Sequence, residues 1–331
     1  MMFKPRSIEE ESFVNEPFYF SYSSLNKLIF SPKLFYTQYV LKQKEEKLES
    51  YLVEGKIIHC LLLEEENFNN QFIISPLKVP NASNKAVIDK VFLKKDERTK
   101  FSDYKNEIVE VLKEVDLHQS LKTDEQRIAK ILIPENELYF EFLKQRENKI
   151  IIDQQTFDKC KKGVEQIKQN KDFQKNVIIK SEWELLDCYN EYYLEYWDPE
   201  LEFGIKGIID NLVIDYENKV VKINDIKTTS KSLVDFKDTV EYYNYWLQAA
   251  MYKRLVTKVL IEKMPQPKDW KINVNFIVYD AYDQVYCFPV SETSQIVWDH
   301  KLSEKLDEAK YFLENGNFSL PYQFQVGSVL L

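Results

Sequence analysis

Two acidic residues and a lysine lie at the ends of neighbouring β-rich segments in the second half of the chain. Asp210 ends the segment GIKGIID, and Asp225 is followed two residues later by Lys227 in VVKINDIK. Alternation along a strand places Asp225 and Lys227 on the same face. Hard divalent cations prefer oxygen ligands, so two carboxylates and the backbone carbonyl of Ile226 would supply half of a magnesium shell. The spacing predicts a metal site with a lysine beside it.

Lys227 is the residue that would act on the reacting groups. A lysine beside a bound metal can orient or deprotonate an attacking water, or stabilise the charge that grows on a phosphate. By itself, an aspartate two residues before a lysine at a strand end is frequent in proteins without such a site. Gln248 and Tyr252 lie one turn apart on the next predicted helix, where an amide and a phenol could meet a phosphate or a base. Helix surface or core edge is the ordinary alternative for these two residues.

The order of the segments GIKGIID, NDIKTT and QAAMY resembles the PD-(D/E)XK nucleases, in particular the RecB-like branch with its Q-x-x-x-Y motif. Within that branch, HCLLLE at residues 59–64 and EYYLEYWDPE at residues 191–200 resemble the RecE-type phage exonucleases, also called exonuclease VIII. The resemblance covers roughly residues 20–72 and 180–255. The segment between them resembles no family that we can name.

This resemblance implies a role for each matching residue. His59, Asp210 and Asp225 would hold the metal, and Lys227 would be the catalytic lysine. Glu191 matches a family glutamate that lies near the site and is counted among the catalytic residues. Mg²⁺ is the expected cofactor, and the imidazole ligand makes Mn²⁺ an alternative. Without the resemblance, a hydrogen-bonded histidine on an apolar helix explains His59 as well.

Four residues are expected to contact DNA. Gln248 and Tyr252 match the Q-x-x-x-Y pair. Lys206 precedes Asp210 in a segment where relatives often place an arginine, so it either replaces that charge or is a solvated lysine at a strand end. Ser24, in the helical stretch after residue 20, is the fourth residue that we expect to contact DNA.

Composition and missing motifs exclude other classes of protein. The net charge of −9 and the pI near 5.2 argue against a protein that coats DNA non-specifically, although a nuclease can be acidic overall and keep a local basic channel. No phosphate-binding GxxxxGK[ST] loop is present, so ATP is not expected. The cysteines have no zinc or iron–sulfur spacing; they are Cys60, Cys160, Cys188 and Cys287.

The sequence predicts a soluble protein that does not bind a membrane. No apolar run approaches the roughly 18 to 20 residues of a membrane span. The first residues, MMFKPRSIEEESF, lack the apolar region of a signal peptide. We therefore expect a cytoplasmic protein with reduced thiols, and the resemblance implies a phage-encoded or prophage protein in a bacterial host cell.

The predicted fold is α/β (α+β): a restriction-endonuclease-like PD-(D/E)XK core with a mixed central β-sheet flanked by helices and a large helical insertion. A single nuclease domain is expected over residues 1–331. Within it, residues 20–75 would form the N-terminal helices that carry the histidine, and residues 76–180 the helical insertion. Residues 181–331 would form the sheet core, with the catalytic motifs and a C-terminal helix.

Local patterns predict several elements more closely. Periodicity indicates helices near residues 52–65 and 240–259, and a C-terminal helix that stops at Gly316. Alternating residues around Asp280–Asp283 indicate a hairpin.

Capping and breaker signals give further expectations. Ser23 or Ser24 is expected to cap the first helix, and Thr156 a later one. The first dozen residues are expected to be a loose arm, and residues 71–89 an irregular surface loop.

The leading hypothesis from the sequence is a Mg²⁺-dependent deoxyribonuclease, a 5′→3′ exonuclease on linear duplex DNA in phage-type recombination or replication. Its partners would be DNA, as duplex ends or as a single strand, and a single-strand annealing protein. The polarity and a homo-oligomeric ring are implied by the resemblance and not by the residues. A catalytically idle DNA-binding scaffold and a structure-specific endonuclease on the same fold are the alternatives.

Overall fold

The structure of the protein is a computed structural model that describes residues 2–43, 50–76 and 78–327. The chain divides into two compact units, one formed by residues 1–63 with 163–331 and the other by residues 64–162. The second unit overlaps the insertion expected over residues 76–180, but both of its ends lie earlier in the sequence than expected.

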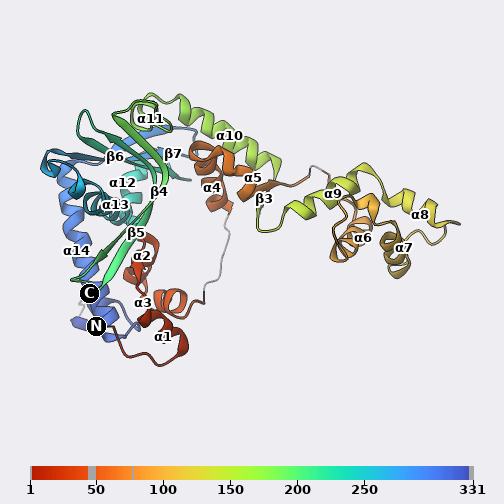
Figure 1. The fold of residues 1–331 in the computed structure, drawn as a ribbon, viewed down its shortest axis with the longest axis horizontal. Coiled ribbons are helices and arrows are strands. Elements are labelled where there is room, and N and C mark those ends of the chain that lie inside the picture. Colours follow the sequence, from red (N-terminus) through yellow and green to blue (C-terminus); the bar gives the residue numbers. More distant parts are fainter. Residues whose placement is uncertain (1, 44–49, 77, 328–331) are drawn as a thin grey trace. The chain divides into compact units, whose positions relative to one another are not determined.

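The first unit is built on a mixed β-sheet (Figure 1). The strands run in the order β1-β5-β6-β7-β8, and β4 pairs with β5. The β1–β5 and β6–β7 pairs are parallel, and the β4–β5, β5–β6 and β7–β8 pairs are antiparallel. This arrangement confirms the predicted mixed central sheet. The strands are β1 Tyr19–Phe20, β4 Leu186–Asp198, β5 Phe203–Asp215, β6 Val220–Thr228, β7 Lys271–Tyr279 and β8 Val285–Pro289.

Strand β5 has a gap in its pairing that positions the site. β4 pairs along one edge of β5 on both sides of Asp210, and the register skips Glu191 and Asp210. On the other edge, β1 pairs with Gly204 and Ile205, and β6 pairs with residues 211–215. Between them, residues 206–210 have no strand partner on that edge within the described parts of the chain. The sheet therefore opens where β5 and β6 separate, next to Asp210.

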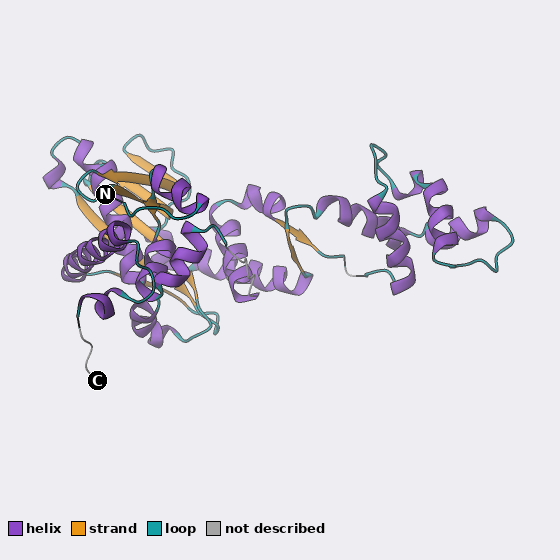
Figure 2. Ribbon diagram, turned by 90° about the horizontal axis from the view of Figure 1, so that it is seen from below, coloured by secondary structure: helices purple, strands orange, loops and turns teal. Residues whose placement is uncertain are grey.

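Helices of the first unit pack around this sheet, as the secondary-structure colours of Figure 2 show. Helix α13 packs on β4 and β5, and α14 packs on α13. Leu247, Met251 and Leu255 of α13 are fully buried together with Ile209 of β5. The helices are α1 Ile8–Asn15, α2 Tyr22–Phe30, α3 Pro32–Phe35, the π-helix η1 Tyr36–Val40, α4 Ser50–Leu63, α11 Lys171–Asn176, α12 Phe236–Tyr242, α13 Tyr245–Val259, α14 Glu292–Asn315 and α15 Tyr322–Val326.

Two expectations about the N-terminal region are wrong. The supposed loose arm contains α1, because Ser7 and Glu10 form a reciprocal capping box and Phe13 is buried in the core. Helix α2 is capped by Ser21, whose hydroxyl accepts from the backbone N–H of Ser24. The pattern of three serines identified the start of the helix but not which serine caps it.

The helix predicted over residues 240–259 is two helices. Asn244 adopts a left-handed backbone conformation with a φ of 57°, and this residue separates α12 from α13. Asparagine tolerates this conformation better than most residues. The periodic pattern is continuous across the break, so periodicity alone could not reveal it.

Two elements in the C-terminal part of the chain agree with the sequence predictions. β7 and β8 form the predicted hairpin around Asp280–Asp283. Helix α14 ends at Gly316, which has a φ of 64° and donates its backbone N–H to Phe312. None of the helices in the described parts of the chain has the length and hydropathy needed to cross a membrane.

The second unit is mainly helical and has its own apolar core. Val87, Ile88 and Val91 of α6 pack there with residues of α7 and α9. The prediction of an irregular loop over residues 71–89 is therefore wrong, because this segment contains β2 and most of α6. The elements are η2 Glu65–Asn67, α5 Phe68–Gln71, β2 Phe72–Ile74, α6 Ala82–Leu93, η3 Phe101–Asp103, α7 Lys105–Glu114, α8 Asp124–Ile131, α9 Pro134–Gln145 and β3 Ile150–Ile152.

Helix α10, Gln154–Gln169, spans the boundary between the two units in sequence. It begins two residues before the expected cap, Thr156. The carboxylate of Asp153 accepts from the backbone N–H of Thr156 at 2.7 Å, so Asp153 caps the helix. The predicted cap therefore lies one turn too late. As in α2, several side chains near the start of the helix could accept a hydrogen bond from its first backbone N–H groups, and the sequence does not show which one does.

Candidate active site

Asp210 lies where β5 and β6 stop pairing. The last paired residues are Asn211 of β5 and Asn224 of β6. One residue beyond this point, the carboxylate of Asp210 replaces the missing strand partner and accepts from the backbone N–H of Ile226 at 2.6 Å. Only 7% of Asp210 is exposed. The strand ends therefore hold this carboxylate in a fixed direction, toward the gap.

His59 reaches the same place from α4. Its Nε2 lies 2.8 Å from the carbonyl oxygen of Ile226. Because a carbonyl only accepts, Nε2 carries the proton and donates it. Nδ1 faces two carboxylates, with Glu191 Oε1 at 3.8 Å and Asp210 Oδ2 at 3.7 Å. The imidazole thus connects helix α4 to the branch point of the sheet.

Glu191 enters the site through an unusual backbone conformation. It lies in β4 between two residues whose β5 partners, Ile209 and Asn211, flank Asp210, and its φ of 47° is in the left-handed region. This conformation costs a residue other than glycine on the order of 1–2 kcal/mol. Its neighbours Asn190 and Tyr192 keep regular pairing with β5. The strain is therefore local, and it brings the carboxylate near Nδ1 of His59.

Asp225 and Lys227 form a buried ion pair beside this group. Nζ of Lys227 lies 2.6 Å from Oδ2 of Asp225, and the side chains are 15% and 2% exposed. The angles fall outside ordinary hydrogen-bond geometry, and Oδ1 of Asp225 has no hydrogen-bond partner among the described residues. A buried carboxylate oxygen without a partner is costly. A bound cation would give Oδ1 of Asp225 the partner that it lacks.

A chain of side chains from α13 fixes Lys227. Its ammonium donates to Oε1 of Gln248 at 3.0 Å, and Nε2 of Gln248 donates to the hydroxyl of Tyr252 at 2.8 Å. Tyr252 packs on Gly207, where an added Cβ would lie 2.6 Å from the tyrosine ring. Glycine at this position is required for the close approach of α13 to β5.

The electrostatics of the cluster reflect burial and mutual attraction. Burial alone would lower the pKa of His59, but Asp210 and Glu191 outweigh it and raise the pKa to about 9. Burial raises the pKa of Asp225 to about 6 despite the attraction of Lys227. Burial also raises the pKa of Asp210. For Lys227, burial is outweighed by Asp225 and Asp210, which raise its pKa.

A row of four asparagines crosses the sheet beside the carboxylates. Asn211, Asn224 and Asn275 are buried, and Asn190 is half-buried. Asn211 donates to Oδ1 of Asn190, Asn224 donates to Asn211, and Asn275 donates to Asn224, each at 2.9 Å. Asn211 and Asn224 also donate to the backbone carbonyls of the segment before β4. We call these four residues the asparagine ladder. It crosses β4, β5, β6 and β7.

The sequence analysis missed the asparagine ladder. Its signal is present in the sequence as an asparagine beside each acidic residue, at Asn190-Glu191, Asp210-Asn211 and Asn224-Asp225. Each pair places an amide on one face of the sheet and a carboxylate on the other.

The structure groups the predicted metal ligands differently from the sequence. His59, Glu191 and Asp210 each offer a ligand atom, and these atoms lie within 4.8 Å of one another. Asp225 is adjacent, but its carboxylate faces Lys227. The carbonyl of Ile226 accepts from His59. The sequence placed Glu191 near the site, and the structure brings it to the imidazole.

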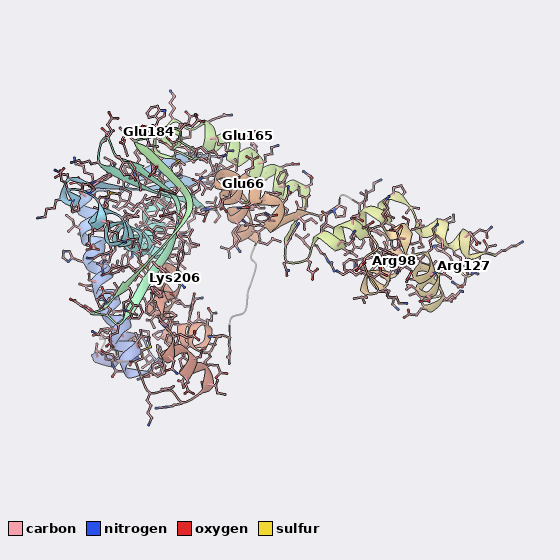
Figure 3. The ribbon with its side chains drawn as sticks, in the orientation of Figure 1. Glu66, Arg98, Arg127, Glu165, Glu184 and Lys206 are labelled. Carbon is pink, nitrogen blue, oxygen red and sulfur yellow. The ribbon has the colours of Figure 1, made fainter. Side chains whose placement is uncertain are left out.

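Three of the four residues expected to contact DNA lie in the interior. Ser24 is 1% exposed, and its hydroxyl bonds to the backbone of Ser21. Gln248 and Tyr252 are 9% and 6% exposed and hold Lys227 instead. Lys206 differs from these three: Figure 3 shows it on β5, where it is partly exposed.

The donor set fits a hard divalent cation. Carboxylate and carbonyl oxygens suit Mg²⁺ and Mn²⁺, and one imidazole is compatible with Mn²⁺ in particular. The unpartnered Oδ1 of Asp225 supports the same conclusion. The residues present therefore fit the metal that the sequence predicted.

Comparison with known proteins identifies the family. A solved structure of a candidate exonuclease from Eubacterium rectale is similar to the chain, with 11% sequence identity and a TM-score of 0.46. The similarity covers 93% of this chain and 87% of that one. The search of curated proteins finds no match. The model of the PD-(D/E)XK nuclease superfamily matches residues 19–310, a range that holds the whole site. The chain therefore belongs to the PD-(D/E)XK nuclease superfamily.

Proposed function

We propose that this nuclease hydrolyses phosphodiester bonds of DNA in a Mg²⁺-dependent reaction, and that it acts as a 5′→3′ exonuclease on linear duplexes. The cluster of His59, Glu191 and Asp210, with ligand atoms within 4.8 Å of one another, is the observation that supports metal dependence most directly. The polarity and a role in phage-type recombination or replication rest on the RecE-type resemblance of residues 59–64 and 191–200.

We assign the metal to His59, Glu191, Asp210 and Asp225, with the carbonyl of Ile226 as a further oxygen donor. The chemistry that a metal supplies when bound is Lewis acidity, toward the scissile phosphate and toward an attacking water. The protein residues supply the rest. Strands β4, β5 and β6 hold the carboxylates in place before substrate arrives, which avoids reorganisation during the reaction.

Lys227 acts as a donor in this proposal and not as a base. Its partners are the carboxylate of Asp225, the amide oxygen of Gln248 and the face of the Tyr245 ring at 4.8 Å. These groups favour the ammonium form, and its pKa is raised. A protonated lysine donates hydrogen bonds, so we assign it to orient the attacking water and to stabilise charge on the phosphate.

Two substitutions that preserve shape test this site. Asp225→Asn and Lys227→Gln should each slow digestion of an end-labelled linear duplex in Mg²⁺ by about 100-fold or more, since one lost transition-state contact costs that much in other enzymes. Asp215→Asn, a change at the far end of β5, is the control and should digest normally. Undiminished digestion by both site variants, with folding verified by circular dichroism, would disprove the assignment.

The same digestion separates the alternative functions. A covalently closed circle should stay intact, and its cleavage would indicate a structure-specific endonuclease. An idle scaffold would bind the duplex without releasing label, and calorimetry would show no Mn²⁺ binding that Asp225→Asn removes. Labels on the 5′ and 3′ ends report the polarity. An annealing partner and a homo-oligomeric ring stay predictions of the resemblance.

A further inference from the structure

A row of tyrosine rings leads from Lys227 toward the protein surface. Nζ of Lys227 lies 4.8 Å from the centre of the Tyr245 ring. Tyr245 stacks on Tyr243 with the ring centres 5.6 Å apart, and Tyr243 meets Tyr242 edge to face at 4.9 Å. At the outer end, Nζ of Lys231 lies 5.4 Å from the centre of the Tyr242 ring. We call Tyr242, Tyr243 and Tyr245 the tyrosine row.

The row is anchored at one end and open at the other. Tyr245 packs against Phe236 and Phe276, which are both 2% exposed. Tyr243 and Tyr242 are 45% and 75% exposed. Packing of the core therefore explains the inner ring but not the two outer ones, which keep much of their surface exposed although each already contacts a neighbouring ring.

The turn that carries the row is held by side chains of two helices. Asn244, in its left-handed conformation, donates through Nδ2 to Asn26 at 2.7 Å and accepts from the indole N–H of Trp246 at 2.9 Å. The amide of Asn26 and the hydroxyl of Tyr22 both donate to the carbonyl of Tyr243. The outer rings are thus placed in advance, which lowers the ordering cost of binding a ligand.

The charges near the row favour a polyanion. Lys227 and Lys231 lie at its two ends. On α12, Glu241 lies 3.8 Å from Lys301. Lys227 is paired with Asp225, so Lys231 is the cation at the exposed end of the row. Aromatic rings with cations beside them bind unpaired nucleotides in other proteins, because bases stack on the rings and phosphates contact the cations.

We propose that the tyrosine row binds the unpaired bases of a single-stranded end whose scissile phosphate lies at Lys227. This inference rests on the proposed nuclease function, which places the phosphate there. A base inside a duplex has both faces covered by its neighbours, so it cannot stack on Tyr242 or Tyr243. The row therefore selects the frayed or single-stranded part of the substrate, without regard to its sequence.

Binding without cleavage tests the row. The full-length chain is mixed with a single-stranded oligonucleotide that carries 2-aminopurine, in EDTA, so that binding is measured whether or not the protein cleaves. Tyr242→Ala and Tyr243→Ala should each weaken binding by about fivefold or more, the usual effect of removing one stacked ring. Tyr242→Phe and Tyr243→Phe should bind within about twofold of the original chain, because they keep the ring.

Controls make the result specific. Tyr216→Ala, at an exposed tyrosine just beyond the far end of β5, should leave binding unchanged. Thermal melting should show that all variants fold. Equal binding by the alanine variants, an equal loss in the phenylalanine variants, or failure of the original chain to bind the single strand would each overturn the proposal. Loss of nuclease activity in other experiments would leave this result unaffected.

Discussion

Under the proposed metal assignment, the His59 side chain would exchange a proton for a metal ion. Its pKa is raised to about 9, so in the metal-free protein at neutral pH the imidazole is a cation between Glu191 and Asp210. Asp225, whose pKa is raised to about 6, retains part of its proton below neutral pH. Metal ligands bind in their deprotonated forms, so metal binding releases protons.

The stabilisation of the fold by Mg²⁺ should therefore increase with pH. The contribution of His59 to stability is complete below its unfolded pKa of about 6.5 and is lost as the pH rises through 9. The contribution of Asp225 to stability is complete below its unfolded pKa of about 3.9 and is lost as the pH rises through 6. Metal affinity rises over the same range. Thermal melting should show a larger increase with Mg²⁺ at pH 8.5 than at pH 6; an equal increase would contradict the assignment.

Tyr252 acts on Lys227 through Gln248. Tyr252→Phe removes the acceptor that orients the Gln248 amide, so its oxygen is no longer directed at the lysine. We expect kcat to fall about three- to tenfold, the effect of one lost hydrogen bond, with Mg²⁺ affinity unchanged. Tyr286→Phe, at an exposed tyrosine of β8, is the control. A weaker Mg²⁺ affinity in place of a slower reaction would show that Tyr252 supports the metal ligands.

At the scale of elements, the asparagine ladder aligns four strands. Side-chain amides of Asn211 and Asn224 are fully buried and bridge neighbouring strands. A slip of β5 or β6 by one residue would move Asn211 or Asn224 to the other face of the sheet and put the adjacent aspartate in its place. The ladder therefore fixes the strand register that brings Asp210 and Asp225 to the same side.

Asn224→Ala should destabilise the protein and weaken metal binding together. It removes bonds to Asn211, Asn275 and the carbonyl of Asn176, leaving buried groups without partners. We expect a loss of about 2–4 kcal/mol in urea unfolding and a weaker Mn²⁺ affinity in calorimetry. Asn218→Ala, in the β5–β6 turn, should leave the Mn²⁺ affinity unchanged. Unchanged affinity in Asn224→Ala would show that the ladder stabilises the sheet without positioning its carboxylates.

The positions of the strands could be predicted from the sequence, whereas the contacts between buried side chains of the site could not. Alternation and motif spacing located β5 and β6, and with them Asp210, Asp225 and Lys227. The left-handed backbone at Glu191 was not predictable, because residues distant in sequence impose it and no glycine signals it. For Gln248 the sequence left DNA contact, helix surface and core edge open, because its partner Lys227 lies on another element and becomes apparent only in the fold.

At the scale of the whole molecule, the second unit has a core that does not include the site. Tyr104, Phe140 and Ile108 are fully buried within residues 64–162. Pro80 and the polar residues around Asn81 suggested a loop to the sequence analysis. Only the shared core shows that Val87, Ile88 and Val91 belong to a helix.

Phe140→Ala tests whether the two units are independent. The cavity should cost about 3–5 kcal/mol of stability in the second unit, which limited proteolysis would detect as faster cleavage within residues 64–162. Mn²⁺ affinity should not change, because every ligand lies in the first unit. A parallel loss of Mn²⁺ binding would show that the second unit supports the site.

The distribution of the site along the chain also determines when activity arises during synthesis. His59 precedes the sheet by a long stretch of sequence, and β6 forms its parallel pair only after β7 has emerged. Contacts between residues so distant in sequence form late in folding. A chain that has been synthesised only through Lys227 still lacks Gln248 and Tyr252, so the lysine has no support. If the proposed site assignment holds, an incomplete chain of this design lacks the contacts that hold its catalytic lysine, so we expect nuclease activity only once the chain has been made through Tyr252.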